Sequence, residues 1–238
     1  MRCVFTDGVV FVNIIESMKD FCPNGNIDFS SEGMHMQVLD AAHVAMCSMV
    51  LRTNVFETFC CPAPLSLGVN FKTLSMMLKN AKGRLEMKSN GNKLELCLQK
   101  MSGTAEYSMN LMNIDSEHLS IPVMVSPATC VLSAATFCKV MRDVSEFSDT
   151  CKLQIGDTFS VSAHGDIGSV GWTSEDCTCN VISSVPAEEF SLRYLSLFSK
   201  CSVSSKVVIC MSLNMPVSVT FPIDHGFMRF YLAPKIVE

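Results

Sequence analysis

Apolar residues recur along this chain at two different periods, and the period changes several times. Near the start, the segment 9–21 (VVFVNIIESMKDF) carries apolar residues at spacings of three and four, at Val10, Ile14, Met18 and Phe21. That spacing places them on one stripe of a helix. We therefore expect a first helix over 9–21.

The pattern then changes to strict alternation. Between 26 and 38, polar residues separate five apolar ones: Ile27, Phe29, Met34, Met36 and Val38. Alternation predicts half-buried strands, and the Ser31-Glu32-Gly33 break predicts a hairpin between them. A further strand is expected over 44–51.

Helical spacing returns over 71–81 (FKTLSMMLKNA), and Lys82-Gly83 is a typical helix stop. Alternation follows over 84–98 around the turn Ser89-Asn90-Gly91-Asn92, because Asn-Gly is a strong hairpin signal. Tyr107, Met109 and Leu111 alternate in one more strand. The segment 113–127, with two prolines and no period, is predicted to be a linker.

The second half repeats this order. A helical stripe is expected over 134–147, strands over 152–155 and 159–163, and a second helix over 190–201. Phe71 and Phe190 are expected to start equivalent helices. The repetition predicts two similar α+β domains, 1–112 and 128–238, joined by a connector over 113–127. Each domain would hold two helices on one side of antiparallel strands.

Composition narrows the class of protein. Hydrophobic residues make up 48% of the 238 positions and charged residues 17%, which favours a folded globular chain over a disordered one. No apolar run approaches the roughly 20 residues that a membrane helix needs. The first twenty residues include Asp7, Glu16 and Asp20, so we expect neither a membrane protein nor a secretory leader.

The thirteen cysteines do not indicate a disulfide framework. Their number is odd, the chain is long, and Asn-x-Ser/Thr acceptor sites are absent from the sequence, so a reducing compartment is expected. Only Cys60-Cys61 and Cys177-x-Cys179 lie close together in sequence, with no second pair at a zinc-binding spacing. We therefore predict no metal site, and interpret Cys and Met as adaptable apolar core residues.

Two other sequence features have alternative interpretations. Cys60 or Cys61 with His43 and Asp40 has the residue types of a thiol nucleophile, its base and an orienting acid, although nothing in the spacing requires them to meet. The glycines of 165–171 (GDIGSVG) are not followed by a capped helix, so a turn or bulge is favoured over a phosphate-binding loop.

Five short strings, read in order, resemble the proliferating cell nuclear antigen family. They are Asp40-Ala41-Ala42-His43-Val44, Gly68-Val69-Asn70-Phe71, Leu78-Lys79-Asn80-Ala81, Leu192-Arg193-Tyr194-Leu195 and Tyr231-Leu232-Ala233-Pro234-Lys235-Ile236. The resemblance runs from about 11 to 236. It implies a DNA sliding clamp, a polymerase processivity factor that is not an enzyme and needs no cofactor or metal. The implied fold has two clamp domains per chain, antiparallel sheets outside and helices inside, in a ring-shaped homotrimer.

The resemblance also implies three surfaces. The DNA-facing cations on the helices would be Lys19, Lys72, Lys79, Lys139, Arg142, Arg193 and Lys200. The client-peptide site would comprise Leu39, His43, Val44, Leu119, Ile121, Pro122, Met215, Pro216, Tyr231, Ala233 and Pro234. The subunit interface would pair Tyr107, Met109 and Leu111 with Gly171, Trp172 and Thr173 of the next copy.

Charge gives partial support for the first surface. The formal net charge is −5, so a basic face would have to be local. Lys72 with Lys79, and Arg193 with Lys200, lie seven residues apart and therefore on one side of a helix. Such cations are typical of any solvated helix, and equally of sequence-independent phosphate binding. The first helix has Val12 and Asn13 where members of the family tend to carry lysines.

The partners implied by the resemblance are double-stranded DNA of any sequence, a DNA polymerase, a clamp loader, and other replication and repair proteins that carry a short clamp-binding motif. No membrane partner is expected. The implied location is the nucleus, or a viral replication site for a viral member. The alternative assembly is a subunit of a heterotrimeric ring, of the checkpoint or archaeal type.

Overall fold

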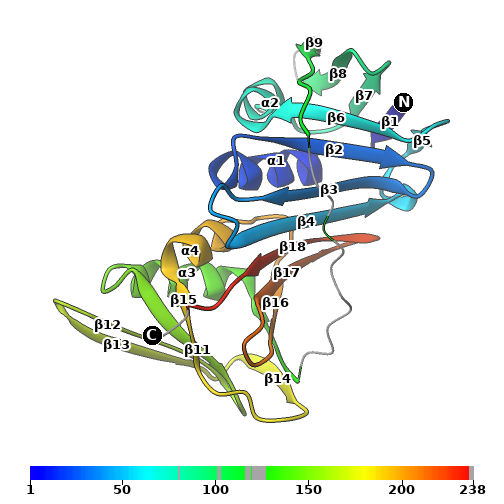
Figure 1. The fold of residues 1–238 in the computed structure, drawn as a ribbon. Coiled ribbons are helices and arrows are strands. Elements are labelled where there is room, and N and C mark those ends of the chain that lie inside the picture. Colours follow the sequence, from blue (N-terminus) through cyan, green and yellow to red (C-terminus); the bar gives the residue numbers. More distant parts are fainter. Residues whose placement is uncertain (80, 101–102, 116–118, 120–126, 236–238) are drawn as a thin grey trace. The chain divides into compact units, whose positions relative to one another are not determined.

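The computed structural model describes residues 1–238 except for 80, 101–102, 116–118, 120–126 and 236–238 (Figure 1). Its contacts divide the chain into two compact units. Unit 1 comprises 1–41, 47–119 and 223–228, and unit 2 comprises 42–46, 120–222 and 229–238. Strands that cross a boundary are given below under the unit that holds most of their residues.

Unit 1 contains two helices and antiparallel strands. The helices are α1 (Val9–Phe21) and α2 (Phe71–Leu78), with a 3-10 turn at Thr53–Val55. One sheet has the order β5-β1-β7-β8-β9, and β4, β3, β2 and β6 are neighbours in that order. The strands are β1 (Arg2–Phe5), β2 (Asn24–Ser30), β3 (Gly33–Leu39), β4 (Ala45–Arg52), β5 (Thr58–Cys60), β6 (Leu65–Asn70), β7 (Leu85–Ser89), β8 (Lys93–Lys100) and β9 (Gly103–Asn110).

Unit 2 repeats this plan. Its helices are α3 (Ala134–Ser145) and α4 (Leu192–Ser199). The strand orders are β14-β10-β16-β17-β18 and β13-β12-β11-β15. The strands are β10 (Ala128–Ser133), β11 (Thr150–Ile155), β12 (Phe159–Gly165), β13 (Gly168–Ser174), β14 (Cys177–Val181), β15 (Glu188–Ser191), β16 (Lys206–Met211), β17 (Val217–Ile223) and β18 (Gly226–Leu232).

In each unit the two helices pack against each other, α1 on α2 and α3 on α4. Figure 1 shows α1 behind β2 and β3. Fully buried phenylalanines fill the space between helices and strands: Phe5 and Phe11 stack in unit 1 with ring centroids 5.6 Å apart, and Phe198 and Phe230 stack in unit 2 at 4.5 Å. Burying such rings supplies much of the stabilisation of a core. The fold is α+β, as the repeated pattern predicted.

Several predicted elements are confirmed. α1 has the predicted bounds, and the β2–β3 and β7–β8 hairpins turn where Ser31-Glu32-Gly33 and Ser89-Asn90-Gly91-Asn92 were expected. The glycine-rich 165–171 segment lies in the β12–β13 hairpin, where Gly165 pairs with Gly168. It is therefore a turn beside the edge strand β13, as the favoured interpretation had it. None of the described helices is long and apolar enough to cross a membrane.

Three details were wrong. Val10 is only half-buried and Phe11 is buried in its place, whereas Ile14, Met18 and Phe21 are buried as predicted. Both α2 and α3 end earlier than expected, at Leu78 and Ser145. Phe190 does not start a helix.

Phe190 instead belongs to β15, where it pairs with Cys151 of β11 and is fully buried. α4 starts at Leu192, after the strand ends at Ser191. An aromatic residue fits a pleated, buried strand as well as a helix, so the spacing pattern extended the helix two residues too far.

Candidate functional site

The helices of both units carry exposed cations. Lys72 lies in the first turn of α2 and Lys79 directly after its last residue; Arg193 and Lys200 occupy the corresponding places on α4. Lys139 and Arg142 lie on the exposed side of α3, opposite the buried Phe137, Val140 and Val144. Among the residues that the structure describes, these six cations form no ion pair within 4 Å, so their charge is available to a partner.

Lys19 on α1 differs from the other six. It forms an ion pair with Glu16 one turn earlier on the same helix. Burial would raise the pKa of Glu16, but hydrogen bonds from Lys19 and from the Ser75 hydroxyl on α2 hold it below its usual value. Lys19 is therefore partly neutralised, and the α1 contribution to a basic surface is weaker than that of α2, α3 or α4.

Two strands that carry predicted interface residues end a sheet. β9 is the last strand of the β5-β1-β7-β8-β9 sheet, and β13 is the last strand of the β13-β12-β11-β15 sheet. Tyr107 and Trp172 are half-buried near the middle of these strands: Lys100 lies over the Tyr107 ring at 5.4 Å, and Trp172 contacts Phe159 edge-on at 6.3 Å. Edge strands present unpaired backbone N–H and C=O groups to any strand that can pair with them.

Met109 and Leu111 are placed differently from Tyr107. Met109 is buried at 5% exposure and packs into unit 1, and Leu111 follows the last residue of β9. Gly171 and Thr173 are exposed on β13, on the opposite face to Trp172. Of the six predicted interface residues, Met109 therefore belongs chiefly to the core of its own unit.

Unit 2 brings several predicted client-site residues to one end of β17 and β18. The two strands are neighbours joined by a short turn, so Pro216, just before β17, lies beside Ala233, just after β18. The Ala233 N–H donates to the Val44 carbonyl at 2.9 Å, which adds the 43–44 segment. We call the surface formed by His43, Val44, Leu213, Met215, Pro216, Ala233 and Pro234 the strand-end surface.

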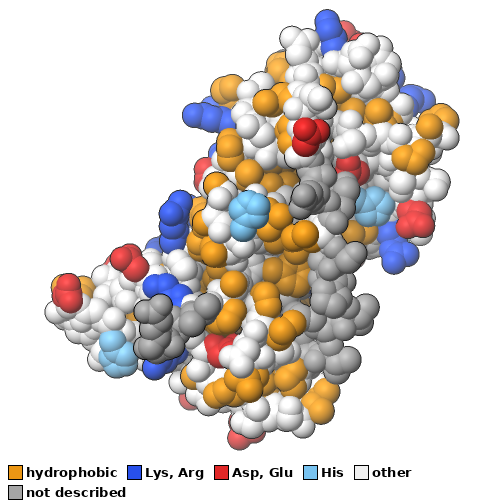
Figure 2. Space-filling model, viewed as in Figure 1, with side chains coloured by type: hydrophobic (Ala, Val, Ile, Leu, Met, Phe, Trp, Pro, Cys, Tyr) orange, Lys and Arg blue, Asp and Glu red, His pale blue; other side chains and the backbone are white. Residues whose placement is uncertain are grey.

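The strand-end surface exposes apolar side chains. Leu213 is 55% exposed, Val44 39% and Met215 38%. Figure 2 shows hydrophobic side chains gathered over the strands of unit 2 on the viewed face. Tyr231, by contrast, is buried at 9% exposure, so it offers little of its side chain to a partner. Contiguous exposed apolar side chains of this kind mark interaction sites on soluble proteins.

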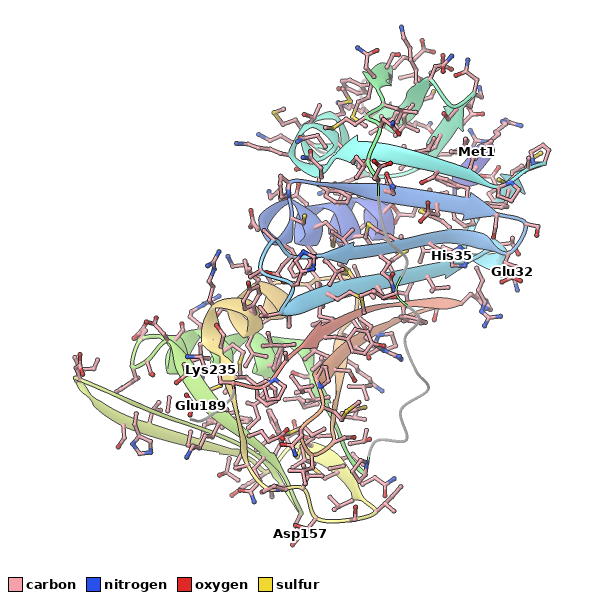
Figure 3. All side chains as sticks on the ribbon, viewed as in Figure 1. Met1, Glu32, His35, Asp157, Glu189 and Lys235 are labelled. Atoms are coloured by element: carbon pink, nitrogen blue, oxygen red, sulfur yellow. The ribbon has the colours of Figure 1, made fainter. Side chains whose placement is uncertain are left out.

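The backbone around the strand-end surface is fixed by specific hydrogen bonds. The Asn214 N–H donates to Glu188 Oε1 at 2.6 Å and the Met215 N–H donates to the Ser212 carbonyl at 3.1 Å, which hold the 212–215 turn. The Lys235 N–H donates to the Glu189 carbonyl at 2.8 Å, and Figure 3 shows these two residues next to each other. The surface is therefore formed before any partner binds.

A pocket of about 610 Å³ adjoins this surface. Its walls are formed by Lys152, Pro186, Ala187, Glu188, Glu189, Leu213, Asn214, Pro234 and Lys235. Within the described residues, Glu188 Oε2 is buried there without a hydrogen-bond partner. None of the recognised strings contains Leu213, Glu188 or Glu189, so these residues were not predicted. The only signal in the sequence was that Leu213, an apolar residue, stands between Ser212 and Asn214, two residue types that favour turns.

The remaining predicted client-site residues belong to unit 1 or lie outside the described residues. Leu39 and Leu119 belong to unit 1, where the Gln37 side chain donates to the Leu119 carbonyl at 2.9 Å and accepts from its N–H at 2.6 Å. These two bonds hold Leu119 beside β3, the strand that ends at Leu39. Ile121 and Pro122 lie outside the described residues.

Comparison with known proteins agrees with this arrangement. The family model "Proliferating cell nuclear antigen, N-terminal domain" matches residues 1–118, and "Proliferating cell nuclear antigen, C-terminal domain" matches 120–236. The proliferating cell nuclear antigen of Caenorhabditis elegans is 32% identical over 244 residues, which cover 94% of this chain and 92% of that protein. The chain therefore belongs to the proliferating cell nuclear antigen family of DNA sliding clamps, processivity factors that are not enzymes.

Proposed function

We propose that three copies of this chain close into a homotrimeric ring around duplex DNA in the nucleus, and that the ring tethers a DNA polymerase and other replication and repair proteins. The supporting observation is that β9 in unit 1 and β13 in unit 2 each end a sheet. Pairing β9 of one copy with β13 of the next would satisfy both edges. Repeating a head-to-tail contact of this kind closes a ring when the rotation allows it.

The helix cations are the proposed DNA surface. Lys72, Lys79, Lys139, Arg142, Arg193 and Lys200 would meet phosphates from any sequence, with a smaller contribution from Lys19. Lysine and arginine contacts to phosphate release counterions and weaken with salt, and they carry no sequence information. A ring that must be loaded by a clamp loader and then slide needs this type of contact.

The experiment for the DNA surface reverses the charge of Lys79 and Lys200 together. We expect Lys79→Glu with Lys200→Glu to reduce polymerase stimulation on primed DNA at moderate salt, and each lost phosphate contact to lower the salt dependence of DNA binding by about one counterion. The control pair is Lys93→Glu with Lys206→Glu, two exposed strand lysines with the same charge change. Undiminished stimulation at every salt concentration, or an equal loss in the control, would contradict the assignment.

The strand-end surface is the proposed docking site for client peptides. Its exposed apolar side chains suit a peptide with apolar and aromatic anchors, and such anchors supply most of the binding energy at interfaces. The buried Glu188 Oε2 offers an acceptor to a donor group of the peptide. The hydrogen bonds that hold the backbone around it would keep the entropic cost of binding low.

Titration calorimetry with a client-motif peptide tests this site. We expect Met215→Glu with Pro216→Glu to weaken binding at least about tenfold, because carboxylates would replace buried apolar contacts. Ile167→Glu is the matched control, since Ile167 is 74% exposed at the tip of the β12–β13 hairpin. Unchanged affinity in the double variant would refute the docking site without bearing on ring assembly.

A further inference from the structure

Three cysteine side chains meet on one face of the β10–β14 strand pair in unit 2. Cys130 of β10 lies directly opposite Cys179 of β14, and Cys177 lies two residues earlier on β14, opposite Leu132. Residues two apart on a strand point to the same face, so the register itself brings the three thiols together. Their Sγ atoms all lie within 4.8 Å of one another.

The spacing of these sulfur atoms suits a thiophilic metal ion. Zinc binds thiolates at about 2.3 Å, which places two sulfurs of a tetrahedral site roughly 3.8 Å apart. The Cys177 and Cys179 Sγ atoms are 3.6 Å apart. Across the described part of the chain, this is the one group of three or more His, Cys, Asp or Glu side chains whose ligand atoms converge.

The three thiols differ in how deeply they are buried and in the direction of their pKa shifts. Cys130 is fully buried, whereas Cys177 and Cys179 are half-buried on β14, the last strand of its sheet, so an ion can reach them from solvent. Burial and the two neighbouring thiols raise the pKa of Cys130. For Cys177 burial acts in the same direction, but hydrogen bonds with the Phe159 backbone and with Cys179, Ser174 and Cys130 together outweigh it and lower the pKa. Backbone N–H groups commonly support metal-bound ligands in this way.

We propose that Cys130, Cys177 and Cys179 form a three-thiolate site for a thiophilic divalent cation of the zinc type, with a fourth position open to water. The ion would join the edge strand β14 to β10, two strands that are separated in sequence by the helix α3 and strands β11 to β13. A bound ion of this kind stabilises the folded state by mass action. The sequence did not reveal this group, because Cys130 is 47 positions from Cys177 and spacing along the chain cannot show that a strand register joins them.

The test uses the full chain, reduced and freed of metal. Titration with Co²⁺ is expected to give one ion per chain with sulfur-to-cobalt charge-transfer absorption, and Zn²⁺ is expected to displace it and raise the melting temperature. Cys177→Ser and Cys179→Ser should each weaken binding at least tenfold. Both residues are half-buried, so these variants disturb the core less than a change at Cys130. The control is Cys60→Ser with Cys61→Ser, adjacent thiols of unit 1 outside the cluster.

A second measurement does not depend on any variant. Zn²⁺ added to the unmodified chain should protect Cys130, Cys177 and Cys179 from alkylation, as mapped by mass spectrometry, while Cys60 stays reactive. The proposal is overturned if cobalt binds without charge-transfer absorption, if Cys177→Ser binds as tightly as the control, or if zinc protects other thiols. A Cys130–Cys179 disulfide trapped directly from cells would also overturn it.

Discussion

At the scale of single residues, Gly68 shows how closely two segments approach in unit 1. The Met112 N–H donates to the Gly68 carbonyl at 2.8 Å, and Gly68 and Met112 form an isolated β-bridge. Beside them, the Asn26 side chain donates to the Ile114 carbonyl at 2.9 Å. The chain leaving β9 is thus held against β6 by contacts that leave no room at position 68.

Gly68→Ala is predicted to destabilise the protein. A Cβ at Gly68 would lie 2.1 Å from the Met112 carbonyl oxygen, and backbone cannot retreat as cheaply as a flexible side chain. We expect a loss of about 1–3 kcal/mol in unfolding free energy, measured by chemical denaturation. Gly156→Ala is the control, because nothing lies within 4 Å of its Cβ position, and it should change stability by less than about 0.5 kcal/mol. Equal effects at the two sites would contradict the steric explanation.

In the sequence, the only sign that Gly68 is important is its place in the Gly68-Val69-Asn70-Phe71 string. Its physical reason, the approach of Met112, joins positions 44 apart and has no local signature. The same holds for Glu188, whose buried carboxylate oxygen becomes notable only beside the 212–215 turn. Residue identities were visible in the sequence, but their neighbours were not.

At the scale of elements, helix starts differ in how they are capped. The Asn70 side chain accepts from the Thr73 N–H at 2.8 Å and donates to Asn24 Oδ1 at 2.7 Å, so it caps α2 and ties it to β2. Ser133 caps α3 in the same manner, through the Thr136 N–H. Ser191 stands at the N-cap of α4, but its side chain makes no capping hydrogen bond.

Removing the α2 cap should therefore cost more than removing the serine before α4. We expect Asn70→Ala to lower the unfolding free energy by about 0.5–2 kcal/mol, since an N-cap side chain satisfies an otherwise unpaired backbone N–H. Ser191→Ala should fall near the bottom of that range or below it, because no cap is lost. Denaturant titrations of the two variants decide this, and a larger loss for Ser191→Ala would show that the capping contacts do not govern these helices.

Element type was more predictable than element bounds. α1 and the hairpins carry a long, unambiguous period, so their positions could be read directly. β1 and β14 are short strands of four and five residues, too brief for a period to be recognised. Phe190 shows a different error. Its spacing fits a helix, but in the structure it belongs to a strand and pairs with Cys151.

At the scale of the whole molecule, the repeated order of elements and the family strings sufficed to predict the α+β fold and the clamp function. The functional surfaces were harder to predict, because each is formed by segments that are far apart in the sequence. The strand-end surface joins residues near 44, 215 and 233, and its outline depends on the β17–β18 turn and on the Val44 to Ala233 hydrogen bond. Subunit assembly is harder still to predict, since it depends on whether β9 of one copy pairs with β13 of another.

Ring closure through β9 and β13 predicts that charge at these edges controls assembly. Ser108 and Thr173 are exposed on the two strands, and like charges placed opposite each other destabilise strand pairing. We expect light scattering at micromolar concentration to give three times the 26.1 kDa chain mass for the unmodified protein, and a lower mass for Ser108→Glu with Thr173→Glu.

Two controls separate strand pairing from a general effect of charge. Gln154→Glu adds the same charge on the exposed side of β11, an interior strand, and should stay trimeric. Ser108→Glu with Thr173→Lys places opposite charges at the two edges and should restore the trimer, because each copy then supplies a complementary pair to its neighbour. A trimer that survives the double-glutamate change would exclude pairing through these edges. An unmodified chain that stays monomeric would instead favour a ring built from different subunits, since a homotrimer must join its own two edges.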